Sequence, residues 1–303
     1  MKPSFSRRAA LLGATSTVLV PGLGFGQPTE RPAEGGLGGT GIVGVVTDLA
    51  VLRVGGSELL TDANTSFSDG FGAVSAADVT LGTSLTVEAA SSADGLLARR
   101  IFITYPLIGA VAAVTPDGRE FQVNGVVVRT ESPLRTLAVG DRVKVSGLWD
   151  GDSVVASAVI ATNETSDLVS GTVSQGFTTA IGPIRILGPG QSRLDDEGFG
   201  TVIGQYDLDR NALVAELVTP NRFIGAAGPL TQLAIEGYLE PTRTAPGYRI
   251  AGLGHSFARN LDLSSFAETR VLFRGGYDGV FRPTSGLRLP EATGERRSIL
   301  RQL

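Results

Sequence analysis

The chain of 303 residues contains few side chains that could do chemistry, since it has no Cys, one His (His255) and one Met (Met1). Iron–sulfur clusters, haem and blue copper need thiolate, thioether or imidazole ligands, and zinc sites nearly always use them as well. We therefore expect no such cofactor. Without Cys the fold has no disulfide, so packing must stabilise it.

The histidine lies in Gly254-His255-Ser256-Phe257-Ala258, which looks like a degenerate nucleophile elbow. A serine nucleophile needs a base that faces it. Adjacent side chains of a strand point to opposite faces, so His255 cannot serve Ser256 in this way. The pattern favours a histidine without a catalytic role, and we predict that the protein is not an enzyme.

Carboxylates remain as acid–base groups, and a glycosidase would need two of them, one with a raised pKa. Most candidates precede a glycine in a predicted turn, where an aspartate caps its own backbone. The acids left over include Asp195, Asp196 and Glu197. These three could bind Ca²⁺, which takes about six to eight oxygens, although their spacing is not that of an EF-hand. A solvated acidic turn is the alternative.

Three aromatic residues, Trp149, Tyr206 and Tyr277, fall at equivalent places just before the last hairpin turn of a repeated module. Aromatic rings at such a place could stack a sugar or a base. A repeated packing role at the mouth of a barrel would explain the same placement. We treat the three as speculative ligand-binding residues, with packing as the alternative.

The module that positions these residues is repeated about four times, and each copy opens with a glycine in a short apolar strand. The glycines are Gly44, Gly109, Gly171 and Gly237, which recur about every 64 residues. This period suits a small barrel or sandwich of four or five short strands. The copies end in a hairpin such as Leu137–Gly147 followed by Trp149-Asp150-Gly151.

The first hairpin of each copy has strong turn signals. Asn124-Gly125 joins two apolar runs in the second copy, and both residues tolerate positive φ. Gly55-Gly56, Gly182-Pro183 and Ala251-Gly252 stand at the matching places. The first copy alone carries a long insertion, residues 61–80, where a departure from the repeat could bind a ligand or be tolerated loop variation.

The N-terminal segment is predicted to be a cleaved export signal, residues 1–27. Ser6-Arg7-Arg8 with Leu11 resembles a twin-arginine signal, and the apolar stretch that follows is short for a membrane span. A flexible Pro- and Gly-rich linker, residues 28–40, comes next. Its Gly36–Gly41 matches G-x-G-x-x-G, but a strand follows it, which argues against a dinucleotide site.

Charge argues against a nucleic-acid partner. Cleavage removes Lys2, Arg7 and Arg8 and no acid, so the formal charge changes from −4 to −7. A nucleic-acid binder needs a basic face that displaces counterions. We therefore expect no nucleic acid and no stable membrane anchor after cleavage, with an unknown envelope protein or a polysaccharide as the partner.

The pattern G-x-V, V-N-G-V-x-V, L-x-V-G-D-x-V-x-V-x-G and V-A-x-x-I resembles the exported bacterial modules of the domain-of-unknown-function family numbered 5666. The resemblance covers nearly all of the mature chain, is strongest in Phe121–Ile160, and weakens in the third copy, where Phe199–Tyr206 replaces the fuller motif. It implies OB-like β-barrels. It implies no catalytic residues, because the family has no known activity.

The sequence thus predicts an all-β protein of about four tandem OB-like barrel modules after the signal and linker. The predicted bounds are 41–104, 106–164, 168–224 and 230–290, with a tail or one short helix at 291–303. The expected function is that of an exported, non-catalytic binding or scaffold protein of the cell envelope, periplasmic or extracellular. The alternatives are an OB-type polysaccharide-binding protein and, second, a carboxylate-dependent hydrolase.

Overall fold

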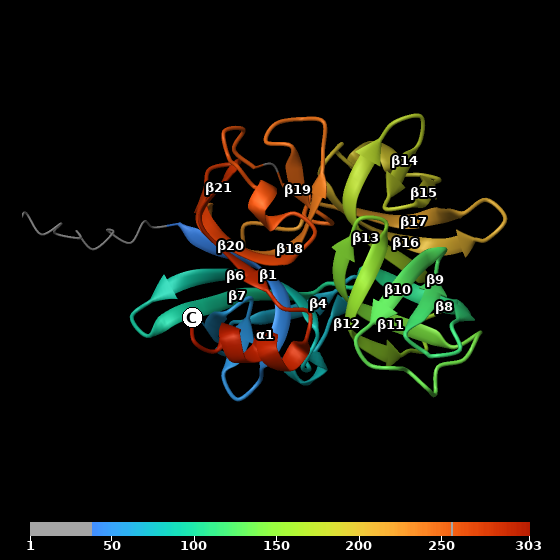
Figure 1. Cartoon of the computed structure of the whole chain (residues 1–303), viewed down its shortest axis with the longest axis horizontal. Helices are drawn as coiled ribbons and strands as arrows, with labels where there is room; N and C mark the ends of the chain where they lie inside the picture. Colours follow the sequence, from blue (N-terminus) through green and yellow to red (C-terminus); the bar gives the residue numbers. More distant parts are fainter. Residues whose placement is uncertain (1–37, 256) are drawn as a thin grey trace, which may run out of the picture. The chain divides into compact units, whose positions relative to one another are not determined.

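Short runs of β-branched and small residues between glycine turns make most of the described chain β-strand (Figure 1). The computed structural model describes residues 38–255 and 257–303. The predicted signal with Arg7 and Arg8, most of the linker, and Ser256 lie outside the described residues. The strands fall into four groups, which we call modules 1 to 4 in chain order.

Module 2 shows how a group closes. Its strands are β8 (Leu107–Val114), β9 (Glu120–Val123), β10 (Val126–Thr130), β11 (Arg142–Asp150) and β12 (Ser153–Ala161). Strand β9 lies antiparallel between β8 and β10, and β10 pairs in parallel with β12. Strand β12 pairs with β11, which returns to β8. The result is a closed five-stranded barrel of OB-like topology.

Modules 1 and 3 repeat this order of pairing. Module 1 contains β1 (Gly39–Asp48), β2 (Leu52–Val54), β3 (Ser57–Leu60), β6 (Ser84–Ser92) and β7 (Gly95–Ile103). Module 3 contains β13 (Asp167–Gln175), β14 (Thr179–Ile181), β15 (Ile184–Leu187), the 3-10 turn η2 (Gln191–Arg193), β16 (Phe199–Asp207) and β17 (Ala212–Pro220). Strand β1 begins inside the predicted linker, because Gly39 and Thr40 already pair with another strand.

Module 4 is reduced. It contains β18 (Leu230–Pro241), β19 (Tyr248–Ile250), the 3-10 turn η3 (Ser264–Phe266), β20 (Arg270–Tyr277) and β21 (Phe281–Leu289). The third strand of the barrel survives as one parallel bridge between Phe257 and Phe281. The expected all-β fold of OB-like modules is confirmed, and the fourth module is its least regular copy.

The insertion of module 1 and the C-terminus add the remaining elements. The insertion forms β4 (Ser66–Asp69), β5 (Gly72–Ala73) and the 3-10 turn η1 (Ala76–Asp78), and β4 extends the sheet of module 1 by pairing with β7. The last residues form the helix α1 (Thr293–Leu300). Among the described residues no helix has the length and apolar character needed to cross a bilayer.

The repeated glycines mark places where neighbouring atoms leave no room for a side chain. The opening glycine of each module faces the end of that module's second strand: a Cβ at Gly109 would lie 2.2 Å from Oδ1 of Asn124, and one at Gly237 would lie 2.3 Å from Cγ2 of Ile250. A second glycine sits at a β-bulge in the fourth strand of three modules. The bulge positions are Gly147, Gly204 and Gly275.

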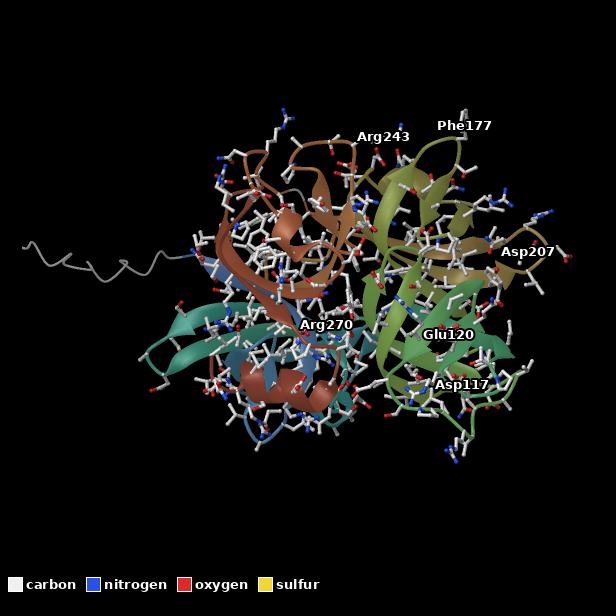
Figure 2. All side chains as sticks on the ribbon, in the orientation of Figure 1. Asp117, Glu120, Phe177, Asp207, Arg243 and Arg270 are labelled. Carbon is white, nitrogen blue, oxygen red and sulfur yellow. The ribbon has the colours of Figure 1, made fainter. Side chains whose placement is uncertain are left out.

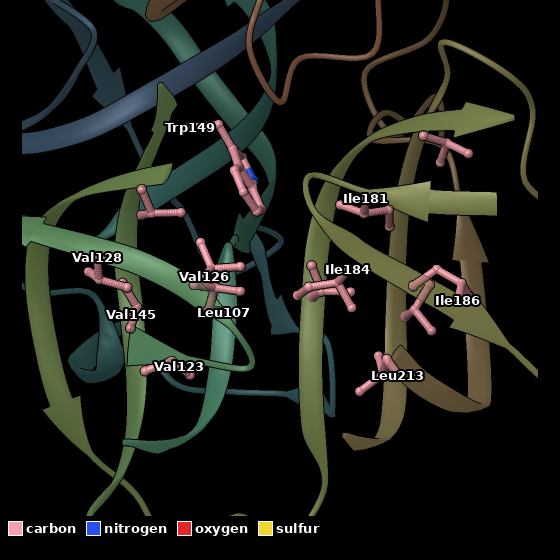
Figure 3. Packing of buried hydrophobic residues seen from close by; sticks show 14 of the residues in the cluster. Leu107, Val123, Val126, Val128, Val145, Trp149, Ile181, Ile184, Ile186 and Leu213 are labelled. Atoms are coloured by element: carbon pink, nitrogen blue, oxygen red, sulfur yellow. The ribbon is translucent and has the colours of Figure 1, made fainter. Parts of the chain in front are cut away.

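Neighbouring modules are joined through their first strands. Strand β1 pairs in parallel with β18, and β8 pairs antiparallel with β13. The hydrophobic clusters also extend from one module to another. One cluster runs from valines of module 2 through Trp149 to the isoleucines Ile181, Ile184 and Ile186 of module 3 (Figure 3).

The bulge glycines generate a stability prediction. In Gly204→Ala the new Cβ would lie 1.9 Å from the carbonyl oxygen of Val214, which is backbone and cannot rotate away. We expect the free energy of unfolding in urea to fall by about 1–3 kcal/mol or more. Gly176→Ala is the matched control, because nothing lies within 4 Å of its Cβ position and the site is exposed. Equal unfolding midpoints for the two variants would contradict the bulge argument.

Candidate functional site

Trp149 packs where three modules meet. Its side chain is 5% exposed, and its Nε1 donates a hydrogen bond to the carbonyl of Ser170 at 2.7 Å. A Cβ at Gly252 of module 4 would lie 2.3 Å from the indole, and one at Gly182 of module 3 would lie 2.6 Å from it. The two glycines therefore make room for the indole between modules 2, 3 and 4.

The other two equivalent aromatics lie at different seams and are half-buried. The hydroxyl of Tyr206 donates to Oδ1 of Asn211 at 2.6 Å, beside Gly125 of module 2. The hydroxyl of Tyr277 lies 3.4 Å from Nδ1 of His255 within module 4. The structure therefore does not bring Trp149, Tyr206 and Tyr277 into one site, and a ligand-binding role for them stays a prediction.

The acidic run of module 3 is exposed. Asp196 accepts a hydrogen bond from the backbone N–H of Gln175 at 2.7 Å, and Glu197 adopts a positive φ of 60° in the turn. Within the part of the chain that the structure describes, no group of three or more His, Asp and Glu side chains could hold a metal ion. No ligand cluster therefore supports the calcium site expected at Asp195, Asp196 and Glu197.

A cavity of about 370 Å³ brings together several side chains that carry chemistry. It lies where β16, the connection between β17 and β18, and module 4 meet. Its side-chain walls include Phe199, Arg222, Phe223, Leu230, His255 and Tyr277. No Asp or Glu is among the described residues that line it.

A buried carboxylate holds the connection that forms one wall of this cavity. Glu88 of β6 is 0% exposed, and it accepts hydrogen bonds from the backbone N–H groups of Ile224, Gly225 and Ala226 at 2.9, 2.8 and 2.7 Å. Arg100 donates to the same carboxylate at 3.2 Å. Four donors fix the position of the chain that carries Arg222 and Phe223, because a buried carboxylate is costly unless it is fully hydrogen-bonded.

Arg222 is the most unusual group of the cavity. Its side chain is 7% exposed and donates to Oγ1 of Thr86 at 3.0 Å and to the carbonyl of Gly252 at 2.6 Å. Its guanidinium carbon lies 3.9 Å from the centroid of the Phe199 ring. Its Nε has no hydrogen-bond partner among the described residues, and no described carboxylate forms an ion pair with it. Burial lowers the pKa of Arg222 to about 9, so the group stays charged at neutral pH.

His255 stands next to this charge and is neutral. Its ring stacks on Phe223 with centroids 5.5 Å apart, and it meets Tyr277 edge to face at 5.6 Å. Burial, with a smaller effect of the Arg222 charge, lowers the pKa of His255 to about 4. Its Nε2 has no partner among the described groups. Ser256 lies outside the described residues, so the nucleophile-elbow pattern stays a sequence resemblance.

A larger cavity of about 490 Å³ lies beside α1, but the polar side chains around it are largely paired with one another. The pairs are Asp150 with Arg129, Thr293 with Glu131 and Tyr238 with Glu291. These pairs are the polar contacts that hold α1 and the residues before it against modules 2 and 4. Nε of Arg129 and one terminal nitrogen of Arg270 also lack a hydrogen-bond partner among the described residues there, but each of these arginines forms an ion pair with a carboxylate. The smaller cavity contains Arg222, which forms no ion pair with a described carboxylate, and it is therefore the candidate functional site.

Sequence reasoning found Tyr277 and examined His255, but it missed Arg222 and Phe223. These two lie in the connection between modules 3 and 4, where no repeated motif marks them. The available signal is an Asn-Arg-Phe run, residues 221–223, at the end of the last apolar strand of module 3. From the sequence alone, an arginine at the end of a strand is expected to be exposed. Its burial follows only from the contacts that this connection makes with Glu88 and Thr86 of β6.

Comparison with protein families matches the chain to the model described as Domain of unknown function (DUF5666), over residues 40–101 and 108–160. These segments correspond to modules 1 and 2, so the resemblance expected from the repeated motif is confirmed there. Searches of curated proteins and of solved structures give no match. The family description carries no activity.

The neutral state of His255 predicts a pH dependence. The pKa of about 4 in the folded chain lies below the ordinary value of 6.5, so the unfolded chain binds more protons between these values. Stability relative to His255→Gln should therefore fall as pH decreases from 6.5 to 4, by up to about 1.4 kcal/mol per pH unit. Urea unfolding of both proteins across this range measures the difference.

The protein has one histidine, so its ring proton gives an unambiguous NMR signal. We expect the chemical shift to titrate below pH 5. A midpoint near 6.5 would show that the ring is solvated and would contradict the described packing.

Proposed function

We propose that the protein is an exported, non-catalytic binding protein of the cell envelope, built from four OB-like modules. The observation that carries the proposal is the cavity around Arg222. It combines aromatic walls with a buried cation that has no carboxylate partner in the part of the chain that the structure describes. Concave, mostly apolar sites with a few polar groups are the usual form of small-ligand sites. The partner is a molecule of the envelope.

Polysaccharide binding is the second candidate function. Tyr277 and Phe223 present aromatic rings to the cavity, and such rings stack on sugars as well as on bases. No feature of the described acids favours the carboxylate-dependent hydrolase, because the acids around the larger cavity are largely paired and Asp195, Asp196 and Glu197 lie on an exposed turn.

Thermal unfolding of the purified protein with chitotriose, maltotriose and trigalacturonic acid tests the binding function. A ligand that binds only the folded chain must raise the midpoint temperature. At a concentration 100 times the Kd it adds about 2.7 kcal/mol to the free energy of unfolding. We expect Tyr277→Ala to fold and to lose the shift, because its ring lines the cavity. Trp149→Ala should instead lose about 3–5 kcal/mol of stability, because the indole is buried between modules.

Tyr206→Ala is the matched control for this experiment. It removes the equivalent tyrosine of module 3, which does not line the cavity, and it should retain the shift. A shift that survives in Tyr277→Ala and disappears in Tyr206→Ala would place the ligand elsewhere. No shift with these three oligosaccharides would contradict an oligosaccharide ligand. Only if the small acids and their neutral analogues also fail to bind would a binding role be contradicted and a scaffold for protein partners favoured.

Export is proposed from the resemblance of Ser6-Arg7-Arg8 to a twin-arginine signal. Replacement of both arginines by lysine keeps the charge but removes the planar guanidinium groups that such a signal requires. We expect the double variant Arg7→Lys, Arg8→Lys to remain in the cytoplasm of cells that export the unchanged protein, as measured by cell fractionation. Arg99→Lys, on module 1, serves as the control. Export of the double variant would remove the twin-arginine interpretation.

A further inference from the structure

We infer that the cavity around Arg222 binds a carboxylate carried on a ring, such as an aromatic acid or a uronic acid. The inference rests on the proposed binding function and specifies its ligand class. It is drawn from the charge of the cavity, from its hydrogen-bonding groups and from its apolar walls.

No carboxylate among the described residues is paired with the charge of Arg222. A buried cation is costly unless a carboxylate balances it. Elsewhere in the described chain this balance is present: Arg270, 2% exposed, lies 2.8 Å from the carboxylate of Glu236. Arg222 has a similar burial, but its fixed contacts are a hydroxyl, a carbonyl and an aromatic face. An anion in the adjoining cavity would supply the missing charge.

The acid that could have played this part is already satisfied. Glu88 lies under the same connection, and three backbone N–H groups and Arg100 occupy its two oxygens. Arg100 also donates to the carbonyl of Arg222, at 3.2 Å. Arg100 therefore contacts the backbone of Arg222 as well as Glu88. The carboxylate of Glu88 forms its ion pair with Arg100 and not with Arg222.

The hydrogen-bonding groups of the cavity favour an acceptor. The polar side chains that line it are Asn221, Arg222, His255 and Tyr277. A guanidinium can only donate, and a tyrosine hydroxyl is able to donate to an ionised oxygen. A carboxylate supplies two oxygens for such donors, whereas a cationic ligand would meet Arg222 without any carboxylate to offset the repulsion.

The walls favour an anion that carries an apolar part over a bare inorganic anion. Phe199, Phe223, Leu230 and Tyr277 surround a volume of about 370 Å³, far more than one phosphate ion fills. A ring attached to the carboxylate would cover these apolar side chains and stack on the aromatic ones. Aromatic and sugar acids share this chemistry, so the experiment must distinguish between them.

The test compares each acid with a neutral analogue of the same shape by titration calorimetry on the purified protein. One pair is 4-hydroxybenzoate and 4-hydroxybenzamide, and the other is galacturonate and galactose. We expect one acid to bind at least about tenfold more tightly than its neutral partner, since hydrogen bonds to ionised groups are markedly stronger than neutral ones. Whichever pair shows this difference identifies the source of the ring.

Arg222→Gln should abolish the preference for the acid, while Arg243→Gln should retain it. Arg243 is exposed on the loop of module 4 (Figure 2) and its replacement changes the net charge equally. Circular dichroism confirms that each variant is folded. If Arg222→Gln does not fold, the comparison of acid with neutral analogue on the unchanged protein decides by itself.

The outcomes separate this inference from the proposed function. Equal binding of an acid and its neutral partner, or a preference that survives in Arg222→Gln, overturns the anion inference and leaves a binding protein for neutral ligands. Binding of chitotriose or maltotriose, without binding of any acid, likewise overturns the anion inference and leaves a binding protein for neutral ligands. Absence of binding with every probe of both panels overturns the inference and the binding function together.

Discussion

The first strand of each barrel is the element on which the whole assembly depends, because it is hydrogen-bonded within its own barrel and to a neighbouring one. Strand β1 pairs with β2, β6 and β18, and β8 pairs with β9, β11 and β13. A strand that serves two barrels has no free edge at these positions. The shared strands, together with the shared hydrophobic clusters, make one body out of repeated units and fix the seams between them.

Polar groups buried at these seams are balanced to different degrees. Glu236 accepts hydrogen bonds from Arg270 and from the backbone N–H of Val45, so its charge is compensated across modules 1 and 4. Glu88 is compensated by backbone groups and Arg100. Arg222 is compensated by no described acid. Since the cost of a buried charge depends on its partners, this one imbalance distinguishes the cavity beside β18 from the other seams.

Local features of the fold were predictable from the sequence, because they depend on neighbouring residues. Asn124 and Gly125 adopt positive φ values of 52° and 75° in the expected hairpin turn. The candidate site was not predictable, because it arises from contacts between modules. Glycines of modules 3 and 4 make room for Trp149, and Thr86 of module 1 accepts a hydrogen bond from Arg222. No periodicity within a strand reports which distant strand will lie beside it. The third strand of module 4 is reduced where Gly252 and Gly254 adopt positive φ values of 69° and 70°, which interrupt an extended strand.

The pairing of β1 with β18 also limits how the protein can reach its folded state. The hydrogen bond from the N–H of Val45 to Glu236 joins residues 191 positions apart in the chain. Contacts so distant in sequence slow folding, since a long loop must close before any contact is gained. While the ribosome is still making module 4, one edge of β1 has no partner. Assembly must therefore wait for nearly the whole polypeptide.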